Sequence, residues 1–203
     1  APVETRLRSL LAMQDLPSRV ANPIIREMLA DPSDDVRLVA YGILDSREKS
    51  INRRIHALRE RLARGEASLV VQLTVLRQLA ELYWELIYQG LVQGDLRRHA
   101  AEQAEKHLDA ALEIAPEDPA LWALRGRLEV GAGRFPQARR AFGNAAGYGL
   151  AEARVLPFLA EASFHLRDYA HVRDLLARIA ETSHTQRMSQ VIEYWGGGGS
   201  PAR

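Results

Sequence analysis

Six histidines are the residues of this sequence best suited to bind a metal ion. A zinc site needs three or four converging ligands, and two of them often stand three or four positions apart on one helix. No two histidines have that spacing, and the chain contains no cysteine. We therefore expect no metal site and no thiolate chemistry. The histidines are His56, His99, His107, His165, His171 and His184.

Two other patterns could carry chemistry, but each also fits a structural role. Asp31, Asp34 and Asp35 lack the glycine and the bidentate glutamate of a calcium loop, and they suit the start of a helix. Gly131 and Gly133 could cradle a phosphate, but they fall where a turn between two helices is expected. No nucleophile elbow, Walker loop or kinase-like set of motifs is present. We expect no enzymatic activity, no catalytic residue and no cofactor.

Positive charge is concentrated between residues 47 and 64, where apolar residues also recur with helical spacing. The pattern predicts a long helix that joins an N-terminal module to the rest of the chain. Its basic face could be solvated and paired at i, i+4, could bind an acidic partner or an anionic membrane surface, or could bind nucleic acid. The residues chosen as the candidate basic surface are Arg47, Arg53, Arg54 and Arg61.

Nucleic acid is the least favoured of these partners. The basic run has no interleaved aromatic residues, and the whole chain has 27 Lys and Arg against 26 Asp and Glu. The absence of cysteine fits a reducing compartment, so the cytoplasm is the expected location. Residues 68–92 are apolar, but Arg77, Glu81 and Glu85 interrupt them too closely for a membrane span.

The two ends of the sequence suggest that it is a fragment. The chain begins with Ala1 instead of Met, so we expect an upstream part that could carry a membrane anchor. Residues 196–203 have the composition of a flexible linker that could be engineered, and they are left out of the fold prediction.

Apolar residues recur at spacings of three and four almost throughout, and alternation with a period of two is lacking. The sequence therefore predicts an all-α fold for its 203 residues, of which 47% are hydrophobic. Asp31 suits the N-cap and Pro32 the first turn of a helix that we expect over residues 32–45.

A period of 34 residues organises the second half of the chain. Three columns of small or apolar residues repeat with this spacing: Ala104, Ala138 and Val172; Leu108, Phe142 and Leu176; Ala111, Ala145 and Ile179. Such a period is typical of stacked helical hairpins.

The best-preserved unit resembles the tetratricopeptide repeat, in which small residues stand where two antiparallel helices approach closely. The residues that carry the resemblance are Trp122, Gly126, Gly133, Phe135, Ala138, Phe142 and Ala145. Arg125, Glu129 and Leu150 depart from the pattern. Residues 29–40 also resemble the second helix of a HEAT-type repeat.

This resemblance implies an α-α superhelix of antiparallel hairpins. The expected parts are a HEAT-like module with the basic helix (1–65), repeats over about 68–118, 119–150 and 151–182, a capping helix at 185–195 and the tail. In the first repeat the turn at Gly94 comes five residues early, which predicts an extended second helix. Pro157 is expected to bend or shorten the first helix of the third repeat.

In tetratricopeptide arrays the first helix of each hairpin lines a concave groove that binds other proteins. Transferred to this chain, that frame predicts a partner-binding groove, here called the predicted repeat groove, formed by Trp84, Tyr88, Leu91, Arg127, Arg154 and Phe164. Aromatic and arginine residues are the types that dominate interface energies. An alternative is that Trp84 and Tyr88 pack on the N-terminal helices.

A closer resemblance comes from residues 29–37 and 82–90 followed by the repeats. Together they are similar to the family of E components of bacterial Pel exopolysaccharide secretion systems, over about residues 25–180. That resemblance implies an inner-membrane protein with upstream transmembrane helices and a cytoplasmic repeat domain. Its implied partners are a cyclic-di-GMP receptor subunit, a glycosyltransferase and a membrane transporter that together make a biofilm polysaccharide. The alternatives are a soluble adaptor or co-chaperone that holds peptide tails, and a regulatory nucleic-acid binder.

Overall fold

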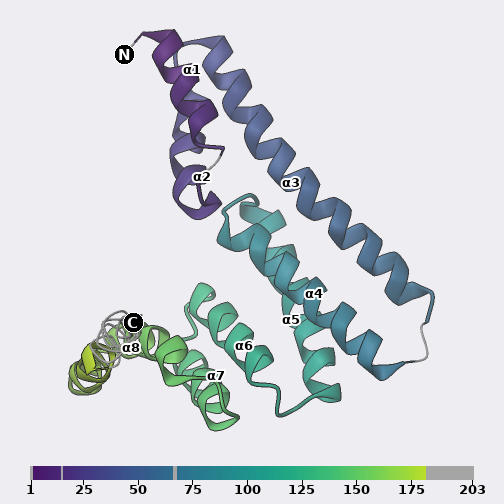
Figure 1. Ribbon diagram of the computed structural model, residues 1–203, viewed down its shortest axis with the longest axis vertical. Coiled ribbons are helices and arrows are strands. Elements are labelled where there is room, and N and C mark those ends of the chain that lie inside the picture. Colours follow the sequence, from purple (N-terminus) through teal and green to yellow (C-terminus); the bar gives the residue numbers. More distant parts are fainter. Residues whose placement is uncertain (1, 15, 66–67, 182–203) are drawn as a thin grey trace, which may run out of the picture. The chain divides into compact units, whose positions relative to one another are not determined.

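A computed structural model describes residues 2–14, 16–65 and 68–181 (Figure 1). All the regular structure in these ranges is helical, which confirms the predicted all-α class. The chain forms two compact units, the first over Ala1–Pro116 and the second beginning at Glu117. Each unit is described by itself.

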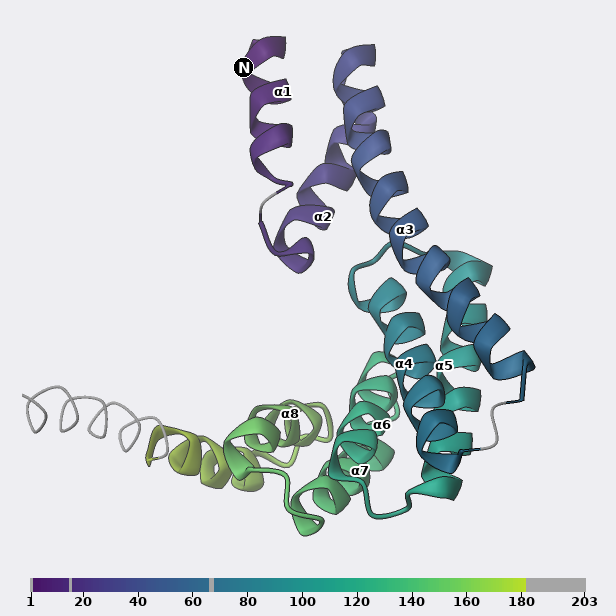
Figure 2. The same ribbon diagram turned by 45° about the vertical axis from the view of Figure 1, so that its right-hand side comes forward.

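Unit 1 contains five α-helices and one 3-10 turn within its described residues. The long helix α3 packs against α1, α2 and η1 along its first half and against α4 further on, and α4 packs against α5 (Figures 1 and 2). Leu10, Ile25, Val36, Ala40 and Ile43 form the core between α1, α2 and α3. The elements are α1 (Val3–Ala12), α2 (Ser18–Glu27), η1 (Met28–Ala30), α3 (Asp34–Ala63), α4 (Leu69–Tyr88) and α5 (Gly94–Ile114).

The prediction of one helix over 32–45 and a second basic helix after it was wrong. Helix α3 is continuous for 30 residues and begins after Ser33, so Asp31 and Pro32 precede it. Asp31 is buried, and its carboxylate accepts a hydrogen bond from the backbone N–H of Ser33 (2.8 Å) and pairs with Arg6 (2.9 Å). The Ser33 N–H above all, and then Arg6, hold the pKa of Asp31 below its usual range, although burial acts in the opposite direction.

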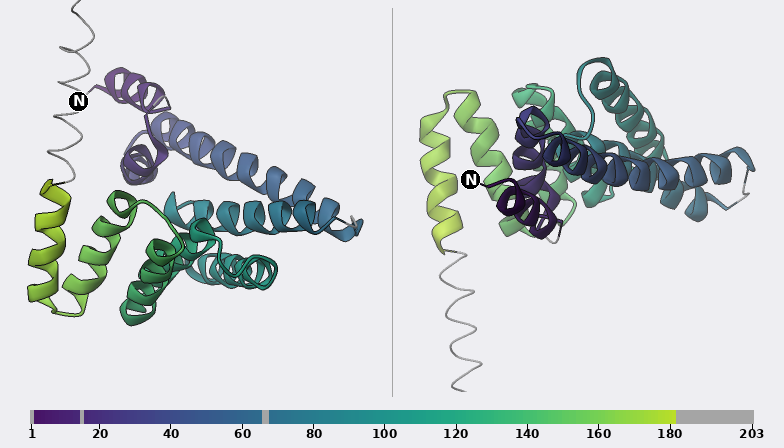
Figure 3. Two further views of the ribbon diagram at one scale, coloured as in Figure 1. Left: turned by 60° about the horizontal axis from the view of Figure 1, so that its bottom comes forward. Right: turned by 90° about the horizontal axis from the view of Figure 1, so that it is seen from above.

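Unit 2 consists of consecutive antiparallel helices: α6 (Pro119–Gly131), α7 (Phe135–Gly147), α8 (Glu152–His165) and a helix over residues 169–181. Helix α6 starts where Asp118 accepts hydrogen bonds from the N–H groups of Ala120 (2.8 Å) and Leu121 (3.2 Å), with Pro119 in the first turn. Helix α8 and the helix after it lie side by side (Figure 3), and Leu156 and Leu175 belong to one buried cluster there.

The 34-residue period reappears in the backbone hydrogen bonds that end α6 and α8. Both helices close with a residue in the left-handed region, Gly133 (φ 74°) and Arg167 (φ 60°), which stand 34 positions apart. Three bonds of the first turn have counterparts shifted by 34 residues in the second. They run from Ala132 to Leu128, Gly133 to Val130 and Arg134 to Glu129, and from Leu166 to Ala162, Arg167 to Phe164 and Asp168 to Ser163.

The columns of small and apolar residues are buried in the first two repeats. Ala104, Leu108 and Ala111 on α5 are inaccessible to solvent, as are their counterparts on α7. In the third repeat Leu176 is exposed, while Val172 and Ile179 are half-buried. The period therefore corresponds to a packed helix face on α5 and α7.

Two predictions about the repeats can be compared directly with the helix bounds. The extended second helix of the first repeat is confirmed, because α5 runs for 21 residues from Gly94. The predicted shortening by Pro157 was wrong, because α8 begins five residues earlier at Glu152 and runs for 14 residues. The expected capping helix at 185–195 and the tail at 196–203 lie outside the described residues.

Candidate interaction surfaces

Three residues of the predicted repeat groove lie in unit 1. Trp84 and Tyr88 stand one turn apart on α4, with ring centroids 5.8 Å apart, and about half of the Tyr88 side chain is exposed. Leu91 follows the end of α4 and lines a cavity of unit 1. Neither Trp84 nor Tyr88 lines that cavity. The two aromatic residues therefore form a surface of their own.

The other three residues lie in unit 2. Arg127 is half-buried on α6, whereas Arg154 and Phe164 on α8 are exposed. Phe164 contacts Tyr169 edge to face (6.0 Å), and the neighbouring His165 stacks on Phe135 (4.1 Å). An exposed aromatic cluster thus stands at the end of α8. The single groove over both units stays a prediction.

The four residues of the candidate basic surface have different environments. Arg47 donates hydrogen bonds to the carbonyls of Met13 (3.2 Å) and Gln14 (3.3 Å) and to the side chain of Asn22. Burial lowers the pKa of its guanidinium. Arg47 therefore holds the end of α1 and the side of α2 against α3, a role for which a cation at a helix C-terminus is suited.

The remaining three basic residues are exposed. Arg53 donates a long hydrogen bond to the backbone carbonyl of Lys49 (3.4 Å), and Arg54 lies 3.9 Å from Glu85. Arg61 is exposed near the end of α3. These three side chains leave a basic face on α3 open to solvent.

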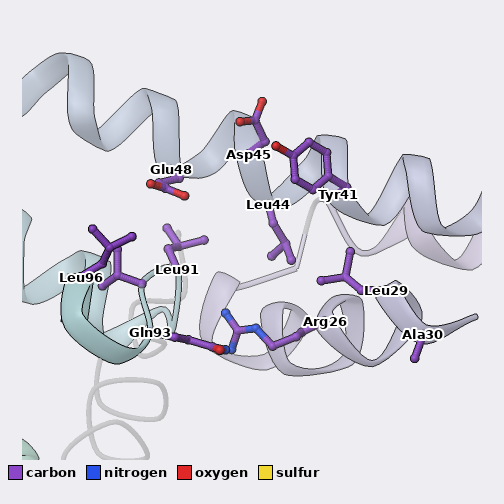
Figure 4. Close-up of a pocket in the computed structure, with 11 residues that line it drawn as sticks. Arg26, Leu29, Ala30, Tyr41, Leu44, Asp45, Glu48, Leu91, Gln93 and Leu96 are labelled. Atoms are coloured by element: carbon purple, nitrogen blue, oxygen red, sulfur yellow. The ribbon is translucent and has the colours of Figure 1, made fainter.

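A cavity that the sequence analysis did not predict lies between α2, α3 and the α4–α5 connection (Figure 4). Its volume is about 600 Å³. Leu44 from α3, Leu29 from η1 and Leu91 point toward its centre, while Glu48 and Arg26 lie on opposite sides. The cavity combines apolar walls with two carboxylates, Asp45 and Glu48, and one guanidinium, Arg26.

A second cavity of about 270 Å³ continues from the first between α3, α4 and α5. Glu48, Val92 and Leu96 line both cavities. The buried His107 stacks on Tyr83 nearby (5.8 Å), and burial, then Lys106 and Arg59, lower the pKa of its imidazole. His107 is thus a neutral packing residue at pH 7.

The described ranges contain neither a cluster suited to a metal ion nor a helix suited to span a membrane. No group of three or more His, Cys, Asp or Glu side chains there is arranged to hold a metal ion. No helix among the same residues has both the length and the apolar character that a membrane crossing requires. No protein-family model, curated protein or solved structure matches this chain significantly.

The residues of the unpredicted cavity left only a weak signal in the sequence. On α3 the core face is formed by Val36, Ala40 and Ile43, yet Leu38 and Tyr41 are apolar on another face. A second apolar face on one helix indicates a second contact surface. This second face of α3 lies opposite Leu96 because of how α4 packs, and the periodicity of α3 does not specify that packing.

Proposed function

We propose that this chain is a non-catalytic scaffold for protein–protein interaction, built from tetratricopeptide-like hairpins after an N-terminal HEAT-like module. The observation that carries the proposal is the 34-residue period, which recurs in the helix-ending hydrogen bonds of α6 and α8. Stacked hairpins of this kind fix the positions of their outward side chains and present them as extended binding surfaces. Exposed aromatic side chains at Tyr88 and Phe164 suit such a role.

The more specific proposal is that the chain is the cytoplasmic repeat domain of an inner-membrane complex that makes and exports Pel exopolysaccharide. It rests on the sequence similarity of residues 29–37 and 82–90 to the E-component family. The partners would be a cyclic-di-GMP receptor subunit, a glycosyltransferase and a membrane transporter, and upstream helices would hold the domain at the membrane. A soluble adaptor for peptide tails is the alternative, and it predicts different partners.

Affinity purification of the full-length protein from its host tests both levels of the proposal. We expect the three Pel partners to co-purify with the wild type. Recovery of chaperones or of unrelated proteins with a shared peptide tail would favour the adaptor instead. Recovery of no specific protein would contradict the scaffold function itself.

The predicted repeat groove is tested with one variant in each unit. Tyr88→Ala or Arg127→Glu should weaken capture of the main partner by about 2 kcal/mol or more, roughly 30-fold, with an unchanged helical circular-dichroism signal. Val70→Ala and Arg98→Glu change exposed residues outside the predicted set and serve as matched controls. If both test variants bind every recovered partner normally, the binding site lies on another surface.

A further inference from the structure

Unit 1 contains an open groove, and Leu91 is the one residue of the predicted repeat groove that lines it. It consists of the two cavities described above and is here called the α3–α5 groove. Because the cavities share Glu48, Val92 and Leu96, they form one continuous depression along α3. Tyr41 lies at one end and Arg59 at the other.

The apolar lining of the groove is unusually accessible. Tyr41 is 61% exposed and Leu96 is 64% exposed, although both are large apolar side chains beside a cavity. Val92, Ile55 and Ala100 form a buried floor below them. A small ligand is usually enclosed over most of its surface, which this wide lining does not provide. The shape suits the side of another helix.

Two half-buried charges in the groove have no partner of opposite sign within the part of the chain that the structure describes. Among the described residues, no cation lies within ion-pair distance of Glu48, whose carboxylate accepts only a long hydrogen bond from Asn52 (3.4 Å). Arg26 lies on the opposite side (Figure 4), and its guanidinium covers Gly90 with no carboxylate at ion-pair distance in the described ranges. Asp45 differs from both because it already pairs with Lys49 (2.8 Å).

These charges specify the chemistry of an occupant. Glu48 on the α3 side would be stabilised by a basic side chain of the occupant, and Arg26 on the α2 side by an acidic one. Burial of the apolar surface between them would contribute about 25 cal/mol of binding free energy per Å². An occupant with one basic edge, one acidic edge and an apolar stripe between them would complement Glu48, Arg26 and the apolar surface of the groove.

The length of the groove indicates how much helix it can hold. Tyr41 and Arg59 stand 18 positions apart on α3, and this separation corresponds to about 27 Å at a rise of 1.5 Å per residue. A partner helix of about five turns would match this length. Helix-in-groove binding of this type uses apolar anchors at i, i+3, i+4 and i+7.

We propose that the α3–α5 groove binds an amphipathic helix of a partner protein, with a Lys or Arg placed against Glu48 and an Asp or Glu against Arg26. Large apolar residues of that helix would lie between Tyr41 and Leu96. The inference rests on the proposed interaction function and names a surface and a partner chemistry for it.

A displayed library of helical 18-residue peptides with varied apolar and charged positions provides the test. Peptides selected on the wild-type chain should carry an apolar stripe with a basic residue on one edge and an acidic residue on the other. Leu96→Asp should weaken their binding at least tenfold. Asp is favourable in the first turn of α5, so this variant is expected to fold.

Charge reversal tests the assigned orientation. Glu48→Lys should weaken the selected peptides about tenfold, and reselection on that variant should replace the basic residue by an acidic one. Val70→Asp is the control, because Val70 is 73% exposed on α4 outside the groove and should leave binding unchanged. Circular dichroism checks the fold of each variant.

The outcomes separate this inference from the broader function. If the selected peptides bind Leu96→Asp and Glu48→Lys as tightly as the wild type, the groove is not the site and the inference is overturned. If Tyr88→Ala then abolishes binding of the same peptides, the chain still has an interaction function, and the binding site lies on another surface. A selection that yields no binding peptide contradicts the groove, and with no partner recovered from the host it contradicts the function too.

Discussion

At the scale of single residues, Gly126 shows why the second repeat needs a glycine. A Cβ atom added there would lie 2.6 Å from ring atoms of Phe142, much closer than side chains approach in proteins. Phe142 is buried and stacks on Phe158 with ring centroids 5.1 Å apart, so its ring has little room to move. The close approach of α6 and α7 therefore excludes a side chain at this position.

Substitution of Gly126 is expected to destabilise unit 2. Gly126→Leu should lower the free energy of unfolding by about 1 to 3 kcal/mol, because overpacking displaces Phe142, and Ala138→Leu at a fully buried site should act similarly. Urea titration followed by circular dichroism measures both. Gly143→Ala is the matched control, since a Cβ there meets no atom within 4 Å.

The control variant Gly143→Ala should raise the free energy of unfolding. Gly143 lies within α7, and alanine in a helix interior is more stable than glycine by about 0.5 to 1 kcal/mol. Unchanged midpoints for Gly126→Leu and Ala138→Leu would mean that the repeat frame assigned from the sequence is incorrect.

At the scale of elements, α3 combines structural and exposed arginines on one helix. Arg47→Ala should destabilise unit 1 by about 1 to 3 kcal/mol, because it leaves the carbonyls of Met13 and Gln14 without their charged donor. Arg53→Ala, one to two turns further along an exposed face, should change stability by less than about 0.5 kcal/mol. Thermal unfolding of the two variants measures the difference. Equal effects would contradict the structural role assigned to Arg47.

The sequence predicts helices well where local periodicity specifies them. The spacing of small and apolar residues located α5, α6 and α7. The role of Arg47 could not be predicted in this way. Two of its three partners are backbone carbonyls more than 30 positions earlier in the chain, and backbone acceptors leave no signature in residue types.

The candidate sites show the same difference between features that local spacing predicts and features that depend on packing. Trp84 and Tyr88 were assigned together to the predicted repeat groove, and they share a face of α4, where their ring centroids lie 5.8 Å apart, because they stand four positions apart. The α3–α5 groove escaped prediction because Tyr41 and Leu96 are 55 positions apart and come together only through the packing of α4 between α3 and α5. Local spacing therefore predicts surfaces on one helix and misses those between helices.

At the scale of the whole molecule, each compact unit has buried clusters of its own. Leu10, Ile25 and Val36 belong to a cluster formed by α1, α2 and α3 in unit 1. Phe142, Val155 and Ala162 belong to a cluster of unit 2. Separate cores are the usual basis for independent folding of domains, with a boundary where few contacts cross.

The last prediction follows from this division at Pro116. A fragment of residues 1–116 should fold alone, with a cooperative thermal transition, because the partners of Arg47 and the cluster around Ile25 all lie inside it. Arg47→Ala should then destabilise the fragment and the full chain by the same amount within about 0.5 kcal/mol, as expected when no contact of the residue is lost with the second unit. Calorimetry of the four proteins gives the comparison, with Gly126→Leu in the full chain as the control that should leave the unit 1 transition unchanged. A fragment that is helical but melts without cooperativity would show that the unit 1 core depends on residues beyond Pro116.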